Sequence, residues 1–304
     1  MSVDAVLIAG PTASGKSRLA LELASRLGGT IINADSMQVY AELSVLTARP
    51  TPVDEARVPH RLYGHRPATN RYSAGRFQEE AALALDEARR AGRTAIFVGG
   101  TGLYFDVLTK GLSPIPAVTA EIREATRRRF ESIGRAAFFA ELASRDSEVA
   151  SKLRPSDTQR LLRAMDVLES SGRPLSHWQA MTGKPVLEGL RTACFVVAPP
   201  RELLTQRIDR RFQEMVKLGA LVEARALLGL DPVLPAAKAL GLPQLWRHLA
   251  GEIPLAAAIV EAQLLTKQYA KRQMTWFRKR MEKWTWIEDA DLRNFIASTS
   301  RDLL

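Results

Sequence analysis

The chain has 304 residues, of which 46 % are hydrophobic, and its 43 Lys and Arg residues outnumber its 33 Asp and Glu residues. This length and hydrophobic content suffice for a sizeable core and predict two domains, and the net charge of +10 favours a polyanionic partner such as nucleic acid. The single cysteine, Cys194, excludes an internal disulfide and a thiolate zinc site, and no apolar run approaches the roughly 20 residues of a membrane-spanning helix. No signal-peptide pattern follows Met1, so the sequence predicts a soluble, cytoplasmic protein.

The first predicted strand and helix enclose a glycine-rich loop. An apolar run at 5–9 precedes the sequence GPTASGKS, and helix-forming residues follow from Arg18. Strand, loop and helix in this order are typical of a phosphate-binding loop (P-loop), in which backbone N–H groups and the helix N-terminus hold a phosphate. Lys16 would reach the outer phosphates and Ser17 could hold Mg²⁺. The candidate diphosphate- or nucleotide-binding residues are Gly10, Pro11, Thr12, Ala13, Ser14, Gly15, Lys16 and Ser17.

The second predicted strand, at 30–34, leads directly into Asp35. In nucleotide hydrolases a later apolar strand usually ends in an aspartate that holds Mg²⁺. The best-formed later strand here, at 94–98, ends instead in Gly99-Gly100-Thr101. The usual hydrolytic aspartate is therefore missing there. Asp35 is the candidate acid at the end of a strand, and it lies earlier in the chain than the hydrolytic aspartate would.

The remaining elements complete an alternation of strands and helices. Helices are predicted at 17–27 and near 74–91, which indicates a parallel sheet with crossover helices. After Pro114 the strands stop, and a helical insertion is predicted, with helices at 120–133, 136–145 and 157–171. Later elements are a strand at 192–198, helices at 201–218 and 255–280, and a short strand at 283–287. The sequence thus predicts an α/β fold with a P-loop NTPase-like parallel-sheet core (1–115 and 190–304), an all-helical insertion domain (116–189) and a helical C-terminal part.

The segment 47–70 is rich in proline and poor in apolar residues, which predicts a long mobile loop close to the active-site face. His60 and His65 lie in this segment without a third ligand, so they are interpreted as exposed or structural histidines. The arginine run at 127–129 is interpreted as a solvated helix face that adds nonspecific attraction to phosphates.

Five segments stand out as a set: GPTASGKS at 10–17, ADSMQVY at 34–40, GGTGLYF at 99–105, RPSDTQRLLRAMDVLE at 154–169 and KRQMTWFRK at 271–279. In this order they resemble the tRNA dimethylallyltransferases, which transfer a five-carbon prenyl group to N6 of the adenosine beside the anticodon. The resemblance spans almost the whole chain. It implies that the P-loop holds the diphosphate of dimethylallyl diphosphate with Mg²⁺, which agrees with the missing hydrolytic aspartate.

The resemblance also implies catalytic roles for Asp35, Thr101, Lys16 and Arg211. Asp35 would accept the proton that leaves the adenine N6 as the new N–C bond forms. Thr101 would donate a hydrogen bond near the bridging oxygen, and Lys16 and Arg211 would neutralise the leaving diphosphate. Other interpretations stay open: Asp35 as a ligand or neighbour of Mg²⁺, Thr101 as a helix N-cap, and Arg211 as a solvated or salt-bridged arginine.

The acceptor adenosine must flip out of the folded anticodon loop to reach a buried prenyl donor. Basic and aromatic side chains of the insertion and of the last long helix are candidate walls for this channel, although Trp276 and Phe277 could instead form a buried helix face. Gly241-Leu242-Pro243 departs from the family pattern where a further RNA contact is expected. The resemblance assigns contacts with the tRNA anticodon stem-loop to Asp35, Ser36, Met37, Gln38, Thr101, Arg123, Gln159, Arg160, Leu161, Leu162, Arg163, Lys271, Arg272, Gln273, Trp276 and Arg278.

Three other functions use the same loop. A small-molecule kinase or ATPase would bind ATP and turn it over, but the basic and aromatic C-terminal helix has no purpose in a metabolite kinase. An adenylate isopentenyltransferase would prenylate free nucleotides, and a noncatalytic RNA-binding protein would use a nucleotide as a switch. The sequence favours the tRNA enzyme over these, acting as a monomer with no membrane partner, with tRNA and dimethylallyl diphosphate as its substrates.

Overall fold

The computed structural model describes residues 3–288 of the chain. Its six strands form one sheet in the order β3-β2-β4-β1-β5-β6, and every pair of neighbours is parallel. The strands are β1 (Ala5–Ala9), β2 (Thr30–Asn33), β3 (His60–Arg61), β4 (Ala95–Gly99), β5 (Thr192–Val197) and β6 (Thr285–Ile287). The predicted α/β fold with a parallel sheet is confirmed, including the strand that follows the last long helix.

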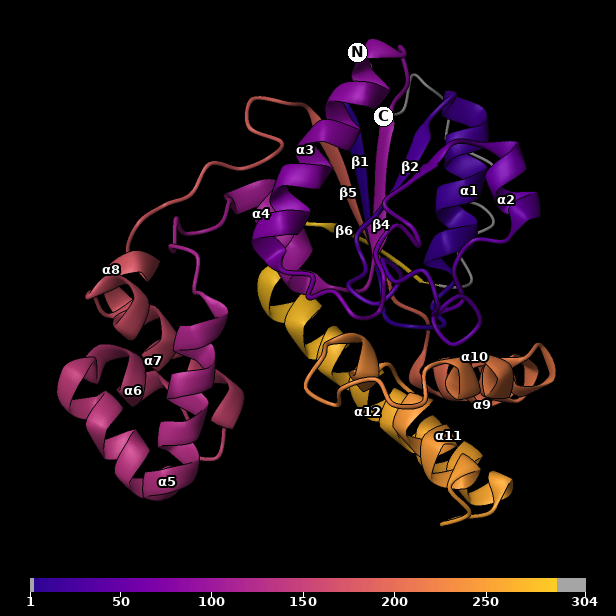
Figure 1. Ribbon diagram of the computed structural model, residues 1–304. Helices are drawn as coiled ribbons and strands as arrows, with labels where there is room; N and C mark the ends of the chain where they lie inside the picture. The colour runs from indigo at the N-terminus through magenta and orange to yellow at the C-terminus, as the bar shows by residue number, and fades with distance from the viewer. Residues whose placement is uncertain (1–2, 289–304) are drawn as a thin grey trace. The chain divides into compact units, whose positions relative to one another are not determined.

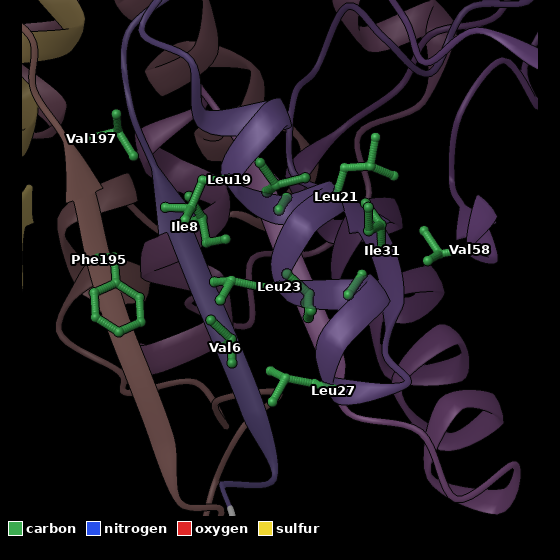
Figure 2. Packing of buried hydrophobic residues seen from close by; sticks show 14 of the residues in the cluster. Val6, Ile8, Leu19, Leu21, Leu23, Leu27, Ile31, Val58, Phe195 and Val197 are labelled. Carbon is green, nitrogen blue, oxygen red and sulfur yellow. The ribbon is translucent and has the colours of Figure 1, made fainter. Parts of the chain in front are cut away.

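One face of the sheet packs against α1 (Lys16–Leu27), as Figure 2 shows. Alternate residues of the central strands point to this face, among them Val6, Ile8 and Phe195, because side chains alternate along a strand. Leu19 and Leu23 of α1 are fully buried against them. Each such leucine contributes about 1.5–3 kcal/mol through burial. This packing fixes the P-loop, because the loop joins β1 to α1.

Helices cover both faces of the sheet, with α3 and α4 on one face and α1 and α2 on the other (Figure 1). The later helices α9 to α12 lie at the carboxyl ends of the strands, where the P-loop also lies (Figure 1). The helices of this unit that have not yet been bounded are α2 (Pro52–Arg57), α3 (Ala74–Arg90), α4 (Gly102–Lys110), α9 (Arg201–Lys217), α10 (Ala220–Ala226), the 3₁₀ helix η1 (Ala236–Lys238), α11 (Leu242–Leu249) and α12 (Leu255–Arg280).

The second unit, Lys110–Pro185, is an insertion into the first. Its helices are α5 (Ala120–Arg145), α6 (Ser147–Lys152), α7 (Thr158–Ser171) and α8 (Leu175–Gln179). Gly134 has a φ of 75° and interrupts α5, which is why the sequence pattern there predicts two helices rather than one. Phe138 and Leu161 are fully buried, so this unit has a hydrophobic core of its own.

The segment 47–70 is more ordered than the sequence predicts. It contains α2, whose start is fixed by a reciprocal hydrogen-bonded box between Thr51 and Asp54, and the edge strand β3. The segment predicted as one long mobile loop therefore contains a short helix and an edge strand. Among the described helices, none is both long and apolar enough to cross a membrane.

Candidate active site

The P-loop turns tightly between β1 and α1. Gly15 has a φ of 95° and Ala13 a φ of 63°, both in the left-handed region, and Ser14 N–H donates to the Pro11 carbonyl over 3.2 Å. A Cβ on Gly10 would lie 2.9 Å from the Val197 carbonyl, so only glycine fits beside β5. The first amides of α1 have no partner within the helix, and together with its dipole they are suited to hold an anion.

Lys16 lies at the centre of the charge in this site. Its Nζ donates to the Pro11 carbonyl over 3.1 Å. Desolvation lowers the pKa of Lys16 to about 8, Asp35 opposes this shift, and Arg211 adds to it. Since the three groups act on one another electrostatically, the structure brings together three residues that are 19 to 195 positions apart in sequence.

Asp35 is held by its own neighbours at the end of β2. The Asn33 side chain accepts from Asp35 N–H over 2.8 Å and donates to the Asp35 carbonyl over 2.9 Å. Asp35 Oδ1 accepts from Met37 N–H over 2.9 Å. A Cβ placed on Gly100 would lie 3.3 Å from Asp35 Oδ2, which puts this oxygen beside the loop that follows β4.

Three tyrosines lie within electrostatic range of the same carboxylate. Burial raises the pKa of Tyr63, Tyr104 and Tyr269, and in each case the charge of Asp35 raises it further. Tyr104 also stacks on Phe77, with ring centroids 3.9 Å apart. Asp35 therefore interacts electrostatically with Lys16, Arg211 and these tyrosines, and Tyr104 is buried with its ring against Phe77.

Thr101 connects the loops that follow β2 and β4. Its Oγ1 accepts from Ser36 N–H over 3.0 Å and donates to Ser36 Oγ over 3.3 Å. Gly99 makes this approach possible, because a Cβ there would lie 2.0 Å from the Ala34 carbonyl oxygen. The Thr101 hydroxyl thus lies next to the segment that carries Asp35.

Gln273 of α12 connects the P-loop to the loop after β4. Its Oε1 accepts from Thr12 N–H over 3.0 Å, and its Nε2 donates to the Gly100 carbonyl over 2.8 Å. Only 5 % of Gln273 is exposed. The sequence places Gln273 among the RNA contacts, but it gives no sign of this bridge, since both partners lie far away in the chain.

The rest of the basic segment of α12 divides into two faces. Phe277 is fully buried, whereas Trp276 is half-buried, contacts Gly102 and lies under the Arg280 guanidinium, 5.4 Å from ring centroid to Cζ. The alternative of a buried stripe is thus correct for Phe277. The predicted RNA contacts that are exposed on this helix are Lys271, Arg272 and Arg278.

A loop at 44–48 is fixed to the site by hydrogen bonds from three elements. The Glu223 carboxylate accepts three backbone N–H bonds, from Ser44 over 2.7 Å, Val45 over 2.5 Å and Leu46 over 3.0 Å. Gln38 Nε2 donates to the Thr47 and Ala48 carbonyls over 2.9 and 3.1 Å, so its amide nitrogen is already engaged.

Arg211 reaches the same loop. Its Nη2 donates to the Thr47 carbonyl over 3.4 Å. Burial lowers the pKa of Arg211, and Asp35 opposes this shift. Arg211 is therefore neither a solvated arginine nor one with a close carboxylate partner among the residues that the structure describes, which leaves its charge directed at the site.

The predicted contacts in the insertion also divide by burial. Gln159, Arg160, Arg163 and Arg123 are exposed, whereas Leu161 is fully buried in the core of this unit. Burial raises the pKa of Asp166, and Thr126 and the two arginines at 163 and 123 counteract that rise. A buried acid thus lies among basic side chains from α5 and α7.

Several residues outside the site are structural, as expected. His60 shares a hydrogen bond of 2.9 Å with the Val58 carbonyl, and His65 pairs with Glu80 over 2.7 Å. Cys194 is half-buried on β5, and burial raises its pKa. Leu242 is fully buried at the start of α11, so the departure at 241–243 places a core residue there. No group of three or more His, Cys, Asp or Glu that could hold a metal occurs within 3–288.

Known proteins with similar sequences and structures agree in their descriptions. A family model described as IPP transferase matches residues 38–280. Proteins named tRNA dimethylallyltransferase from a Bradyrhizobium species and from Rhodopseudomonas palustris are 54 % and 53 % identical, covering 93 % and 94 % of this chain and 92 % and 91 % of their own length.

Two solved structures are similar over most of the chain. A tRNA isopentenylpyrophosphate transferase from Bacillus halodurans has a TM-score of 0.66 at 29 % identity, covering 97 % of this chain and 94 % of its own. A eukaryotic dimethylallyltransferase acting on tRNA has a TM-score of 0.82 at 25 % identity, covering 99 % of this chain and 78 % of its own. With its P-loop, its Asp35 cluster and these similarities, the chain belongs to the IPP transferase family.

Proposed function

We propose that this protein is a tRNA dimethylallyltransferase: it transfers the dimethylallyl group of dimethylallyl diphosphate to N6 of the adenosine 3′ of the anticodon (position 37), in tRNAs that read codons starting with U. The observation that carries the proposal is that Asp35 lies beside the Gly100 loop, which Gln273 ties to the P-loop, within electrostatic range of Lys16 and Arg211. An acid that can accept a proton lies beside cations that can hold a diphosphate, and prenylation of an amine needs both.

The reaction can be written with named residues in each role. N6 attacks C1 of the prenyl group as the bond from C1 to the bridging oxygen breaks, and the proton of N6 passes to Asp35. Negative charge then grows on the bridging oxygen and the diphosphate. The P-loop amides, Lys16 and Arg211 stabilise this charge, and the Thr101 hydroxyl supplies a hydrogen bond near the bridging oxygen.

Mg²⁺ fits this site through the substrate rather than through a protein cage. Ser17 is exposed in the first turn of α1, where its hydroxyl can serve as one ligand. Mg²⁺ is commonly held by one or two protein oxygens together with substrate phosphates, so diphosphate oxygens would supply the other ligands. When bound, the ion neutralises part of the charge on the leaving group.

The acceptor side uses separate surfaces. We assign the grip on the anticodon stem-loop to exposed basic residues of the insertion, such as Arg123 and Arg163, and to Lys271, Arg272 and Arg278 on α12. A monomeric state and a cytoplasmic location remain predictions.

The test is a transfer assay. Purified protein, Mg²⁺, radiolabelled dimethylallyl diphosphate and unmodified tRNA are incubated, and the digested RNA is searched for N6-(dimethylallyl)adenosine. Label on that nucleoside supports the proposal, and a tRNA with guanosine at position 37 serves as the unreactive control. Absence of label together with ATP hydrolysis or phosphorylation of a metabolite would instead identify a nucleotide-using enzyme.

A further inference from the structure

A second basic site lies outside the P-loop and the predicted RNA contacts. It is a hollow of about 410 Å³, here called the basic pocket. Three arginines and two further polar side chains line it, with no acidic residue among them: Arg66, Thr69, Asn70, Arg71, Arg76 and Leu234. Such a lining is suited to an anion that also accepts hydrogen bonds.

The positive charge of the basic pocket is only partly compensated. Arg66 pairs with Glu80, whose carboxylate also accepts from Tyr72 Oη and interacts with His65 Nε2, each over 2.7 Å. This network fixes the orientation of Arg66. The guanidinium groups of Arg71 and Arg76 form no ion pair with any residue in 3–288, so two uncompensated charges remain.

Backbone pairing ties the basic pocket to the segment that carries Asp35. Arg66 N–H donates to the Val39 carbonyl over 3.0 Å, and Ala41 N–H donates to the Arg66 carbonyl over 2.8 Å. Val39 follows Asp35 by four residues. Arg76 lies in the first turn of α3, whose positive N-terminal end adds to the attraction for an anion.

The proposed reaction creates a need for such a site. A flipped nucleotide remains joined to its neighbours through phosphodiesters, so the phosphates beside it must come close to the mouth of the active site. We infer that the basic pocket binds a backbone phosphate of the acceptor tRNA next to the nucleotide that enters the site. This inference rests on the proposed function, because it takes the RNA as the second substrate.

The experiment compares two double variants, with substitutions in α3 or in the segment just before it. Arg71→Ala/Arg76→Ala removes two charges from the basic pocket. Arg89→Ala/Arg90→Ala, the control, removes two exposed charges at the other end of α3. At 1.5 Å per residue these lie roughly 20 Å from Arg76, which is beyond the screening length of about 10 Å at 0.1 M salt. Binding of an unmodified anticodon stem-loop RNA is measured by fluorescence anisotropy between 50 and 200 mM KCl. The KM for dimethylallyl diphosphate is measured in parallel.

The basic-pocket variant is expected to bind the RNA about tenfold more weakly at 100 mM salt. The slope of log K against log salt should become shallower by about 1, because one or two phosphate contacts are lost. The control variant should stay within about twofold of the wild type, and the donor KM should not change in either. Arg71→Glu, which reverses one charge without touching the core, should weaken RNA binding as well.

Equal losses in both double variants would overturn the inference, since they would reflect net charge alone. An increase in donor KM with unchanged RNA affinity would also overturn it and would assign the pocket to a donor phosphate. The proposed function can fail separately. If the wild type transfers no prenyl group, and only the basic-pocket variant binds RNA more weakly, then the pocket inference is supported and the proposed reaction is wrong. If the wild type prenylates tRNA and the pocket variant binds RNA normally, only the pocket inference falls.

Discussion

The bridge made by Gln273 can be tested by replacing it with leucine. Gln273→Leu keeps most of the side-chain volume but leaves the Thr12 N–H and the Gly100 carbonyl without their partner. An unsatisfied buried group costs about 1–3 kcal/mol, and Gly100 is buried whereas Thr12 is half-buried. We therefore expect the free energy of unfolding to fall by about 2–4 kcal/mol.

The same change should weaken the donor more than the RNA. If about 1.4 kcal/mol of this loss destabilises the P-loop conformation that binds the donor, the KM for dimethylallyl diphosphate rises about tenfold. Affinity for the anticodon stem-loop should stay within about twofold, because the side chain is buried and both of its polar atoms are engaged inside the protein.

The assay combines steady-state kinetics, RNA binding and thermal unfolding. Gln263→Leu is the matched control, because Gln263 lies in the same helix and donates to the Asp209 carbonyl, away from the P-loop. It should lower stability without changing the donor KM. A Gln273→Leu protein that loses RNA affinity while keeping its donor KM would refute the reasoning and make Gln273 an RNA contact.

Four further predictions concern charged residues at or near the site. Asp35→Ala should leave tRNA affinity nearly intact and lower the single-turnover rate at least about a hundredfold, and equal losses of both would show that Asp35 only positions RNA. Because the pKa of Lys16 is lowered to about 8 and its protonated form binds the diphosphate, kcat/KM for the donor should fall above about pH 8; a flat profile to pH 9.5 would contradict this. The same shift means that the folded state binds fewer protons than the unfolded state between about pH 8 and 10.5, so this group adds stability as the pH rises through that window, as pH-dependent unfolding would show. In the Glu223→Gln variant the amide cannot accept all three loop N–H bonds equally well, so the melting temperature should fall and kcat/KM should decrease about tenfold. Glu214→Gln, on the exposed face of α9, should change neither quantity.

The long elements of the fold could be predicted because their patterns are local. The helix at 255–280 has the predicted bounds, and the strands around the P-loop differ by at most a residue or so. The strand β3 could not be found, since two residues have no periodicity and its pairing with β2 is a tertiary event. The helix α2 did leave a signal, the Thr51 and Asp54 capping box, which the density of prolines obscured.

Only those residues of the candidate site that lie in recognisable motifs could be predicted from the sequence. Lys16 and Asp35 belong to recognisable segments, and the structure places Arg211 near them. The contacts of Gln273 and Glu223 connect elements separated by more than 170 positions, and no local pattern encodes such a pair. Tyr104 and Tyr269 also come within electrostatic range of Asp35 from distant positions in the chain, which no local pattern predicts.

Thr12 and Gln273 are 261 positions apart in sequence, which affects how the P-loop folds during synthesis on the ribosome. The P-loop is synthesised 261 positions before Gln273, the residue that fixes it to the loop after β4. At a synthesis rate of about 5–20 residues per second, Gln273 is added on the order of tens of seconds after the P-loop. A nascent chain that stalls before α12 therefore carries a P-loop without the hydrogen bonds from Gln273, and it should bind a diphosphate more weakly than the full-length fold.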